Sequence, residues 1–328
     1  MIRSLYRTQE GQLQTGLAPE AFAAASQDSQ GLLWVDLQGE PPAVCEPILH
    51  ETFGFHPLAV DDALQESHVP KLDDWGEYLY LVLHAVVFDE QDGVHVDTLE
   101  LDIFLGKHYL VTHHDHPIVA VDHVWELCQR DERHTKKGVD HLLYRLADEL
   151  VDSHMPVVDR MDEVIDQFED RVFDKPDPST VEQLFALKRA LLYLRRIIAP
   201  QREVLNKLAR DDYAVIVPED RIFFRDVYDH LVRLYDINES MRDLVGGALD
   251  TYLSVVNNRL NEVMKTLTLI TTLFMPISFV AGFFGMNFFQ PVASLVAWTS
   301  RPAFMAMLAV TILTPVGMYL WMRRRAWM

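Results

Sequence analysis

Two long stretches near the carboxyl end of the chain carry no charged residue. Residues 266–300 and 302–322 contain no Asp, Glu, Lys or Arg, although charged residues flank both. A helix needs about 20 mostly apolar residues to cross a bilayer, and segments 264–284 and 303–322 satisfy this. A buried helical hairpin in a soluble protein is the alternative, but neither run leaves a charged face for solvent. The sequence therefore predicts two membrane spans.

Basic residues set the orientation of these spans. They precede the first span and follow the second: Arg259, Lys265, Arg323, Arg324 and Arg325. The connection between the spans contains only Arg301. Because Lys and Arg accumulate on the cytoplasmic side, we expect a multi-pass protein of the cell inner membrane with both termini in the cytoplasm. The first thirty residues show no secretory signal pattern.

The net charge of the chain indicates which kind of molecule it binds. The chain has 29 basic and 49 acidic residues, a net charge of −20. Nucleic-acid partners need a basic face, so we expect cations and not nucleic acids to bind. Cys45 and Cys128 lie far apart with no second Cys or His at metal-ligand spacing, which indicates neither a disulfide framework nor a structural zinc site.

Before the spans, the predicted secondary structure changes near residue 135 from mixed strands and helices to long helices. Residues 1–135 are predicted to form a mixed α/β domain, with strands at 32–37, 78–88, 98–105 and 109–112 and helices at 44–52 and 118–129. Residues 136–262 are predicted to form long helices, with a break at 174–178, where Ser179 and Glu182 suggest a capping box. No proline intervenes between Pro218 and Pro276, so one helical stalk is expected to continue into the membrane part, residues 263–328.

A stripe of small and polar residues follows this stalk at alternating four- and three-residue spacing. Its members are Asp250, Ser254, Asn257, Asn261, Met264, Thr268, Thr271, Met275, Ser278 and Gly282. This spacing places them on one face of a helix. In lipid, such a face lines a water-filled pore or packs against another helix. Periodicity alone leaves both interpretations open.

A tripeptide at the end of the first span favours the pore. Gly285-Met286-Asn287 resembles the GMN signature of CorA-type magnesium channels. The arrangement is also similar: two spans only, a short connection and a basic tail. Further segments that resemble this family are 56–62, 70–71, 224–230, 261–265 and 274–276.

The resemblance implies a funnel-shaped homopentamer with an α/β/α sandwich domain, and Mg²⁺ as both transported and regulatory ion. Gly285, Met286 and Asn287 would form the selectivity filter, with Gly285 supplying backbone freedom and Met286 packing to fix the turn. Asn287 alone could instead be a helix cap. The pore-lining residues would be Asp250, Asn261, Met264, Leu267, Thr271, Met275, Ser278 and Gly282.

The resemblance also implies two sites outside the pore. Asp62 and Asp226 would bind regulatory Mg²⁺ between neighbouring subunits, although each alone is typical of a surface acid. Arg323, Arg324 and Arg325 would form a basic ring at the cytoplasmic end. Asp250 would add an acidic ring, with a solvated stalk carboxylate as the alternative.

Two features depart from the family pattern. Residues 288–300 contain no Asp or Glu, so the outer loop lacks the acidic residue that many members carry. The second departure is a histidine-rich segment that resembles nothing in the family: His108, His113, His114, Asp115 and His116. We expect a surface loop there; a metal site, or a membrane-tethered enzyme that uses it, is the alternative.

Met286 favours the magnesium branch over a proton-coupled zinc transporter of the same superfamily, which stays the second hypothesis.

Overall fold

The computed structural model describes residues 1–65, 69–89, 95–174, 177–286 and 300–324. The chain divides into two compact units, Met1–Tyr252 and Leu253–Met328. Helix α9 (Arg221–Gly285) contributes to both. The domain boundaries at residues 135 and 262 stay a prediction from the sequence.

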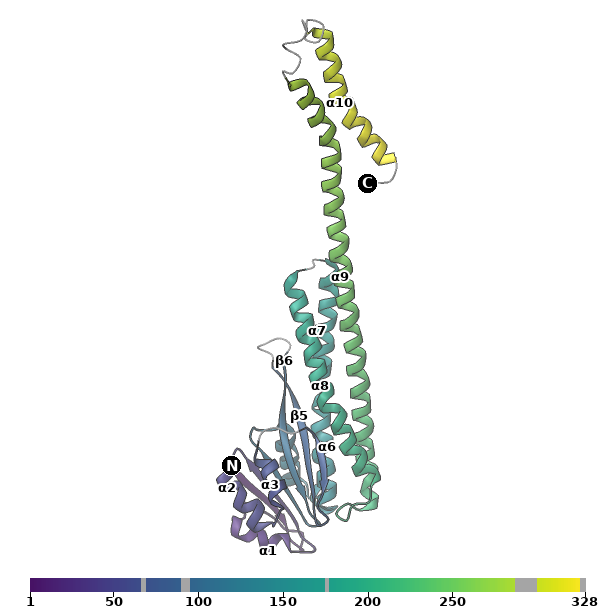
Figure 1. Ribbon diagram of the computed structural model, residues 1–328. Helices are drawn as coiled ribbons and strands as arrows, with labels where there is room; N and C mark the ends of the chain where they lie inside the picture. The colour runs from purple at the N-terminus through teal and green to yellow at the C-terminus, as the bar shows by residue number, and fades with distance from the viewer. Residues whose placement is uncertain (66–68, 90–94, 175–176, 287–299, 325–328) are drawn as a thin grey trace. The chain divides into compact units, whose positions relative to one another are not determined.

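A seven-stranded sheet lies at the centre of the first unit (Figure 1). Its strands are β1 (Ile2–Arg7), β2 (Leu13–Thr15), β3 (Leu32–Gln38), β4 (Lys71–Asp74), β5 (Leu79–Asp89), β6 (His95–Leu105) and β7 (Tyr109–His114). The order is β2-β1-β3-β7-β6-β5-β4, and only the β3–β7 pair is parallel. All four predicted strands are present, as β3, β5, β6 and β7. The short strands β1, β2 and β4 were not predicted.

Helices cover both faces of this sheet. One layer contains η1 (Pro19–Ala21), α1 (Phe22–Ser26), α2 (Pro42–Pro47), the π-helical turn η2 (Ile48–Thr52) and α3 (Pro57–Leu64). The opposite layer contains α4 (Val119–Arg130), α5 (Arg133–Lys136), α6 (Val139–Asp152), α7 (His154–Asp174), α8 (Pro178–Arg210), η3 (Pro218–Asp220) and the first part of α9. The predicted α/β/α sandwich is therefore confirmed, and Figure 1 shows the long helices against the sheet.

Each face of the sheet has its own apolar core. Along β5, Tyr80 and Val82 face the core under α1–α3, whereas Leu81 and Leu83 face the core under α4–α9. Successive side chains of a strand point to opposite faces, so a strand covered on both faces is apolar at nearly every position. This explains the uninterrupted apolar runs that predicted the strands.

The helical hairpin of α7 and α8 has a different cap from the predicted one. Helix α8 begins at Pro178, and the Asp177 side chain accepts a hydrogen bond from the Ser179 backbone N–H at 3.4 Å. The N-cap is therefore Asp177, because the proline occupies the first helical position, where no N–H is needed.

The second unit contains the rest of α9 and helix α10 (Arg301–Arg324). Both helices contain an 18-residue window that is long and apolar enough to cross a membrane, and neither window is buried within the chain. The predicted continuation of the stalk into the first span is confirmed, since α9 is one helix of 65 residues that passes through Pro276.

Candidate functional site

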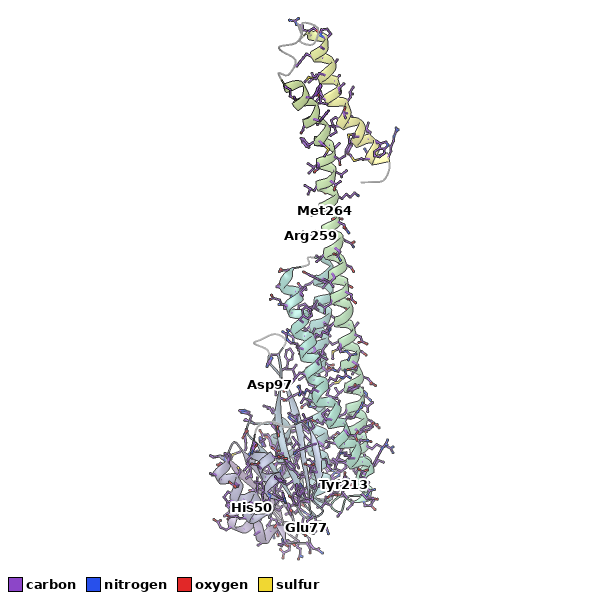
Figure 2. All side chains as sticks on the ribbon, viewed as in Figure 1. His50, Glu77, Asp97, Tyr213, Arg259 and Met264 are labelled. Atoms are coloured by element: carbon purple, nitrogen blue, oxygen red, sulfur yellow. The ribbon has the colours of Figure 1, made fainter. Side chains whose placement is uncertain are left out.

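The predicted pore-lining residues lie along one helix. All eight belong to α9, and all are exposed on the single chain: Asp250, Asn261, Met264, Leu267, Thr271, Met275, Ser278 and Gly282. Figure 2 shows Met264 and Arg259 extending from the helix within the second unit. Positions seven apart lie on nearly the same face of an α-helix, drifting by about 20° per repeat. The single chain therefore leaves the whole stripe open to contact.

Two threonines of the stripe donate their hydroxyl protons to carbonyl groups within the helix. Thr268 Oγ1 donates to the Met264 carbonyl at 2.7 Å, and Thr271 Oγ1 donates to the Leu267 carbonyl at 2.9 Å. A hydroxyl has one proton and two acceptor lone pairs. Each of these threonines therefore presents an oxygen that accepts hydrogen bonds, which suits donors such as the water molecules around a cation.

The predicted filter begins where α9 ends. Gly285 is the last helical residue and has no positive φ, so it does not act as a left-handed cap. Met286 is 58% exposed on the described part of the chain, and its expected packing against the turn stays a prediction. Asn287 lies outside the described residues. The structure thus positions the start of the motif and leaves the role of its asparagine a prediction.

The predicted basic ring begins at the end of α10. Arg323 and Arg324 form the last turn of this helix and are exposed, whereas Arg325 lies outside the described residues. Cations at a helix carboxyl terminus are favourable because they face the negative end of the helix dipole.

Asp62, the first predicted regulatory ligand, lies on α3 beside strand β4. Its carboxylate forms an ion pair with Lys71 Nζ, which also lies 3.3 Å from Asp73 Oδ2. The Asp62 side chain is 37% exposed, so it is reachable from solvent while it contacts this ammonium group.

Asp226, the second predicted regulatory ligand, is exposed on the first turns of α9. Helix α3 covers one core of the sheet through Ala59 and Val60, whereas α9 covers the other through Phe224 and Val227. The two aspartates therefore lie on opposite sides of the sheet, and one chain does not bring them together. A shared ion would need ligands from two subunits, as the resemblance implies.

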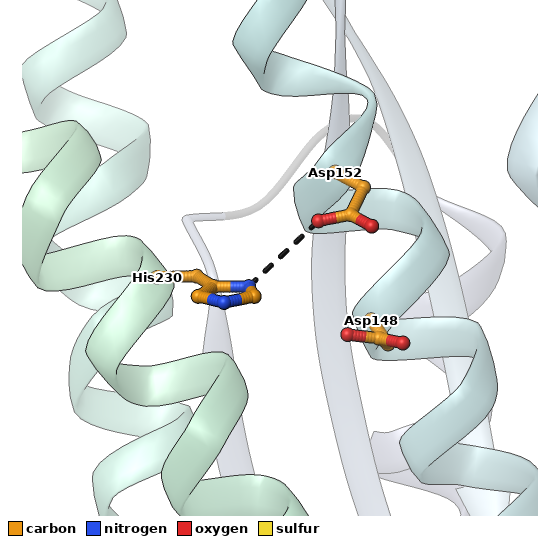
Figure 3. Close-up of side chains that lie close together, drawn as sticks. All are labelled: Asp148, Asp152 and His230. Carbon is orange, nitrogen blue, oxygen red and sulfur yellow. Dashed lines mark ion pairs between the residues drawn. The ribbon is translucent and has the colours of Figure 1, made fainter.

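A cluster that the sequence did not reveal lies one helical turn beyond Asp226. Asp148 and Asp152 of α6 face His230 of α9 (Figure 3), and their ligand atoms lie within 4.8 Å of one another. His230 Nδ1 is 3.7 Å from Asp152 Oδ1. Burial, and then the charge of Asp152, raises the pKa of Asp148. These atoms are close enough to bind one cation, which would relieve the repulsion between the carboxylates.

Sequence spacing could have indicated that Asp148 and Asp152 lie together, but not that His230 joins them. Asp148 and Asp152 are four apart on a helix, as are Asp226 and His230, so each pair shares a face. Nothing in the sequence indicated that α6 and α9 are neighbours at this point.

The histidine segment is only in part the expected surface loop, because His108 lies in the turn before β7 and Asp115 and His116 lie after this strand. His113 and His114 are buried on β7, and only Asp115 and His116 that follow are exposed. His113 Nδ1 lies 3.5 Å from Asp102 Oδ2, whereas His114 Nε2 lies 3.2 Å from Asp36 Oδ1. Because neighbouring strand residues point to opposite faces, the two imidazoles pair with different carboxylates and do not share a metal ion.

Known proteins are similar to this chain over most of its length. The family model described as CorA-like Mg²⁺ transporter protein matches residues 29–324. The cobalt/magnesium transport protein CorA of Thermotoga maritima is 35% identical over 303 residues, covering 92% of this chain and 85% of that protein. The zinc transport protein ZntB of Yersinia pseudotuberculosis is 24% identical over 318 residues, covering 96% and 92% respectively.

The fold also matches a solved structure over its full length. The complete structure of the CorA magnesium transporter from Methanocaldococcus jannaschii has a TM-score of 0.85 at 22% identity, covering 99% of this chain and 98% of that chain. The soluble part, the long helix and the carboxyl-terminal apolar helices thus recur together. The chain belongs to the CorA-like Mg²⁺ transporter family, a family of membrane transporters of divalent cations.

Proposed function

We propose that five copies of this chain form a channel in the cell inner membrane that admits Mg²⁺ to the cytoplasm, with Co²⁺ and Ni²⁺ as further ions. Both termini then lie in the cytoplasm. The observation that carries this proposal is the continuity of α9: its polar stripe begins at Asp250 in the first unit and continues through the apolar span to Gly282, close to the end of the helix at Gly285. Five such helices around one axis would line a pore with this stripe. The T. maritima relative, named for cobalt and magnesium, supports the choice of ions.

Selectivity in this proposal rests on Asn287. Mg²⁺ dehydrates reluctantly, so a filter that stripped its water would impose a large barrier. A ring of neutral amide oxygens instead accepts hydrogen bonds from the coordinated water and reads the size of the hydrated ion. An aspartate ring would hold a dication more tightly and slow its release.

Below the filter, polar and apolar rings would alternate. Ser278, Thr271 and Asn261 offer oxygen acceptors to the hydrated ion, whereas Met275 and Leu267 narrow the pore with apolar groups that stop conduction by dewetting. Asp250 would concentrate cations at the cytoplasmic end, and the ring that begins at Arg323 and Arg324 would oppose them. Entry needs no other energy source, because a dication gains about 4.6 kcal/mol per 100 mV, twice the value for one elementary charge.

A gate is therefore necessary, and Asp62 and Asp226 are its proposed sensors. Hard oxygen ligands suit Mg²⁺, and both carboxylates are accessible on the single chain. A cation shared between Asp62 of one subunit and Asp226 of its neighbour would hold the subunits in the closed arrangement at high cytoplasmic Mg²⁺. The cluster of Asp148, Asp152 and His230 places two further carboxylates near this end of α9.

The test is ion flux in liposomes that contain the purified protein. Mg²⁺, Co²⁺ and Zn²⁺ uptake is measured with and without a pH gradient. Mg²⁺ uptake that follows membrane potential and ignores the pH gradient is the expected result. Zn²⁺ uptake that requires the pH gradient would replace the proposal with proton-coupled zinc transport, the activity class that the ZntB relative keeps open.

A further inference from the structure

Lys71 forms an ion pair with Asp62, the carboxylate that the proposed function assigns to a divalent cation. Its Nζ forms an ion pair with Asp62 Oδ2 and lies 3.3 Å from Asp73 Oδ2. The side chain of Lys71 is 28% exposed, and those of Asp62 and Asp73 are 37% and 45% exposed. One ammonium group is thus shared by two carboxylates at the surface, and solvent reaches all three groups.

The sheet fixes the position of this ammonium group. Strand β4 pairs antiparallel with β5, with Lys71 opposite Val82 and Asp73 opposite Tyr80. Lys71 Nζ consequently lies 5.1 Å from the centre of the Tyr80 ring, the diagonal neighbour on the same face. Tyr80 is itself immobilised, because it is fully buried and its hydroxyl donates to Asp102 Oδ1 at 2.6 Å. The ring, a favourable surface for a cation, therefore holds Lys71 beside Asp62.

The charge of Lys71 is secure. The pKa of a lysine side chain is ordinarily about 10.4, so the ammonium group is positive at neutral pH, and the carboxylates of Asp62 and Asp73 beside it favour this charge. A divalent cation that approaches Asp62 must therefore displace a permanent positive charge.

Asp73 makes this displacement feasible. A lysine ammonium group is a compact charge with three donors on a flexible stem, and Asp73 stands within 3.3 Å as a second partner. Lys71 can release Asp62 and keep Asp73 without becoming an unpaired cation.

We infer that Lys71 is an internal competitor of the divalent cation at Asp62. It thereby sets the Mg²⁺ concentration at which the first unit, Met1–Tyr252, responds. This inference rests on the proposed function, because it takes Asp62 as a cation ligand. Without the competitor, the carboxylate would bind Mg²⁺ at a lower concentration, and the channel would close earlier. The alternative is an ion pair that only stabilises β4 against α3.

The experiment is limited proteolysis of the purified full-length protein across a Mg²⁺ titration, with the midpoint of protection as the measured quantity. Lys71→Met removes the competitor, and Lys71→Gln removes it while keeping a polar side chain in case the first variant folds poorly. Lys107→Met is the matched control, because it removes the same charge from an exposed lysine in the turn between β6 and β7. Each Lys71 variant is also made together with Asp62→Asn.

Both Lys71 variants should lower the midpoint by about two- to fivefold, the range expected for a partly exposed ion pair, whereas Lys107→Met should leave it unchanged. In the Asp62→Asn background the effect of Lys71 should vanish. An unchanged midpoint in Lys71→Met and Lys71→Gln, or an equal shift without the Asp62 carboxylate, would overturn the inference while leaving the proposed sensor intact. If Asp62→Asn itself responds like the wild type, the proposed sensor fails and the inference fails with it.

Discussion

The buried pair of Asp102 and His113 is expected to carry a large share of the stability of the sheet. Asp102 and His113 are opposite each other on β6 and β7, and their side chains are 5% and 6% exposed. Burial lowers the pKa of His113, but its interactions with Asp102 and Cys45 outweigh burial and raise the pKa to about 10. His113 is therefore a buried imidazolium at neutral pH, and Asp102 is its counter-charge.

Replacing Asp102 by Asn removes this counter-charge while keeping the size of the side chain. At pH 7 the raised pKa of His113 lies three units above the pH, which corresponds to about 4 kcal/mol at 1.36 kcal/mol per unit. Asp102 and Cys45 together cause this shift, so about 4 kcal/mol is the upper limit for the loss in Asp102→Asn. Loss of one partner of a buried ion pair costs about 3 to 5 kcal/mol, in agreement. The stabilisation is complete below pH 6.5 and is lost as the pH rises through 10. At pH 9 the difference in unfolding free energy between wild type and variant should fall to about 1 kcal/mol.

The assay is guanidinium unfolding of the full-length protein in detergent, followed by tryptophan fluorescence at pH 7 and pH 9. Asp97→Asn is the matched control, because Asp97 lies on the same strand and is exposed (Figure 2). A loss below about 1 kcal/mol at pH 7, or the same loss at both pH values, would show that His113 is not a buried cation.

Three further outcomes are expected. Asn287→Ala should leave the oligomer assembled but abolish selective Mg²⁺ uptake in liposomes, and wild-type flux in this variant would remove Asn287 from the filter. Asp226→Asn should raise the Mg²⁺ midpoint for protease protection, because it removes one carboxylate of the proposed sensor; coinciding midpoints would leave Asp226 a surface acid. Complete burial lowers the pKa of His154 to about 4, so wild type should lose about 3 kcal/mol between pH 6.5 and 4 relative to His154→Gln. Parallel acid-unfolding curves for these two proteins would contradict this.

The order of apolar and charged residues along the chain was sufficient to predict the two apolar helices near the carboxyl end and four strands of the sheet. Charge-free runs of about 20 residues have few other stable states, and the strands covered on both faces showed unbroken apolar runs such as that of β5. The edge strands β2 and β4 gave no such signal, because Leu13–Thr15 and Lys71–Asp74 are short and mostly polar. Their strand state is decided by the neighbour that they pair with.

The partners of charged groups were decided only by the tertiary structure. The sequence marked His113 and His114 as a cluster, but the pleat of β7 sends one to Asp102 and the other to Asp36. Likewise, Lys71 meets Asp62 only because β4 is placed beside α3. Hydrophobic periodicity is a local property that is visible along the sequence, whereas an ion pair depends on which segments the sheet brings together. That information is not contained in the spacing of the residues.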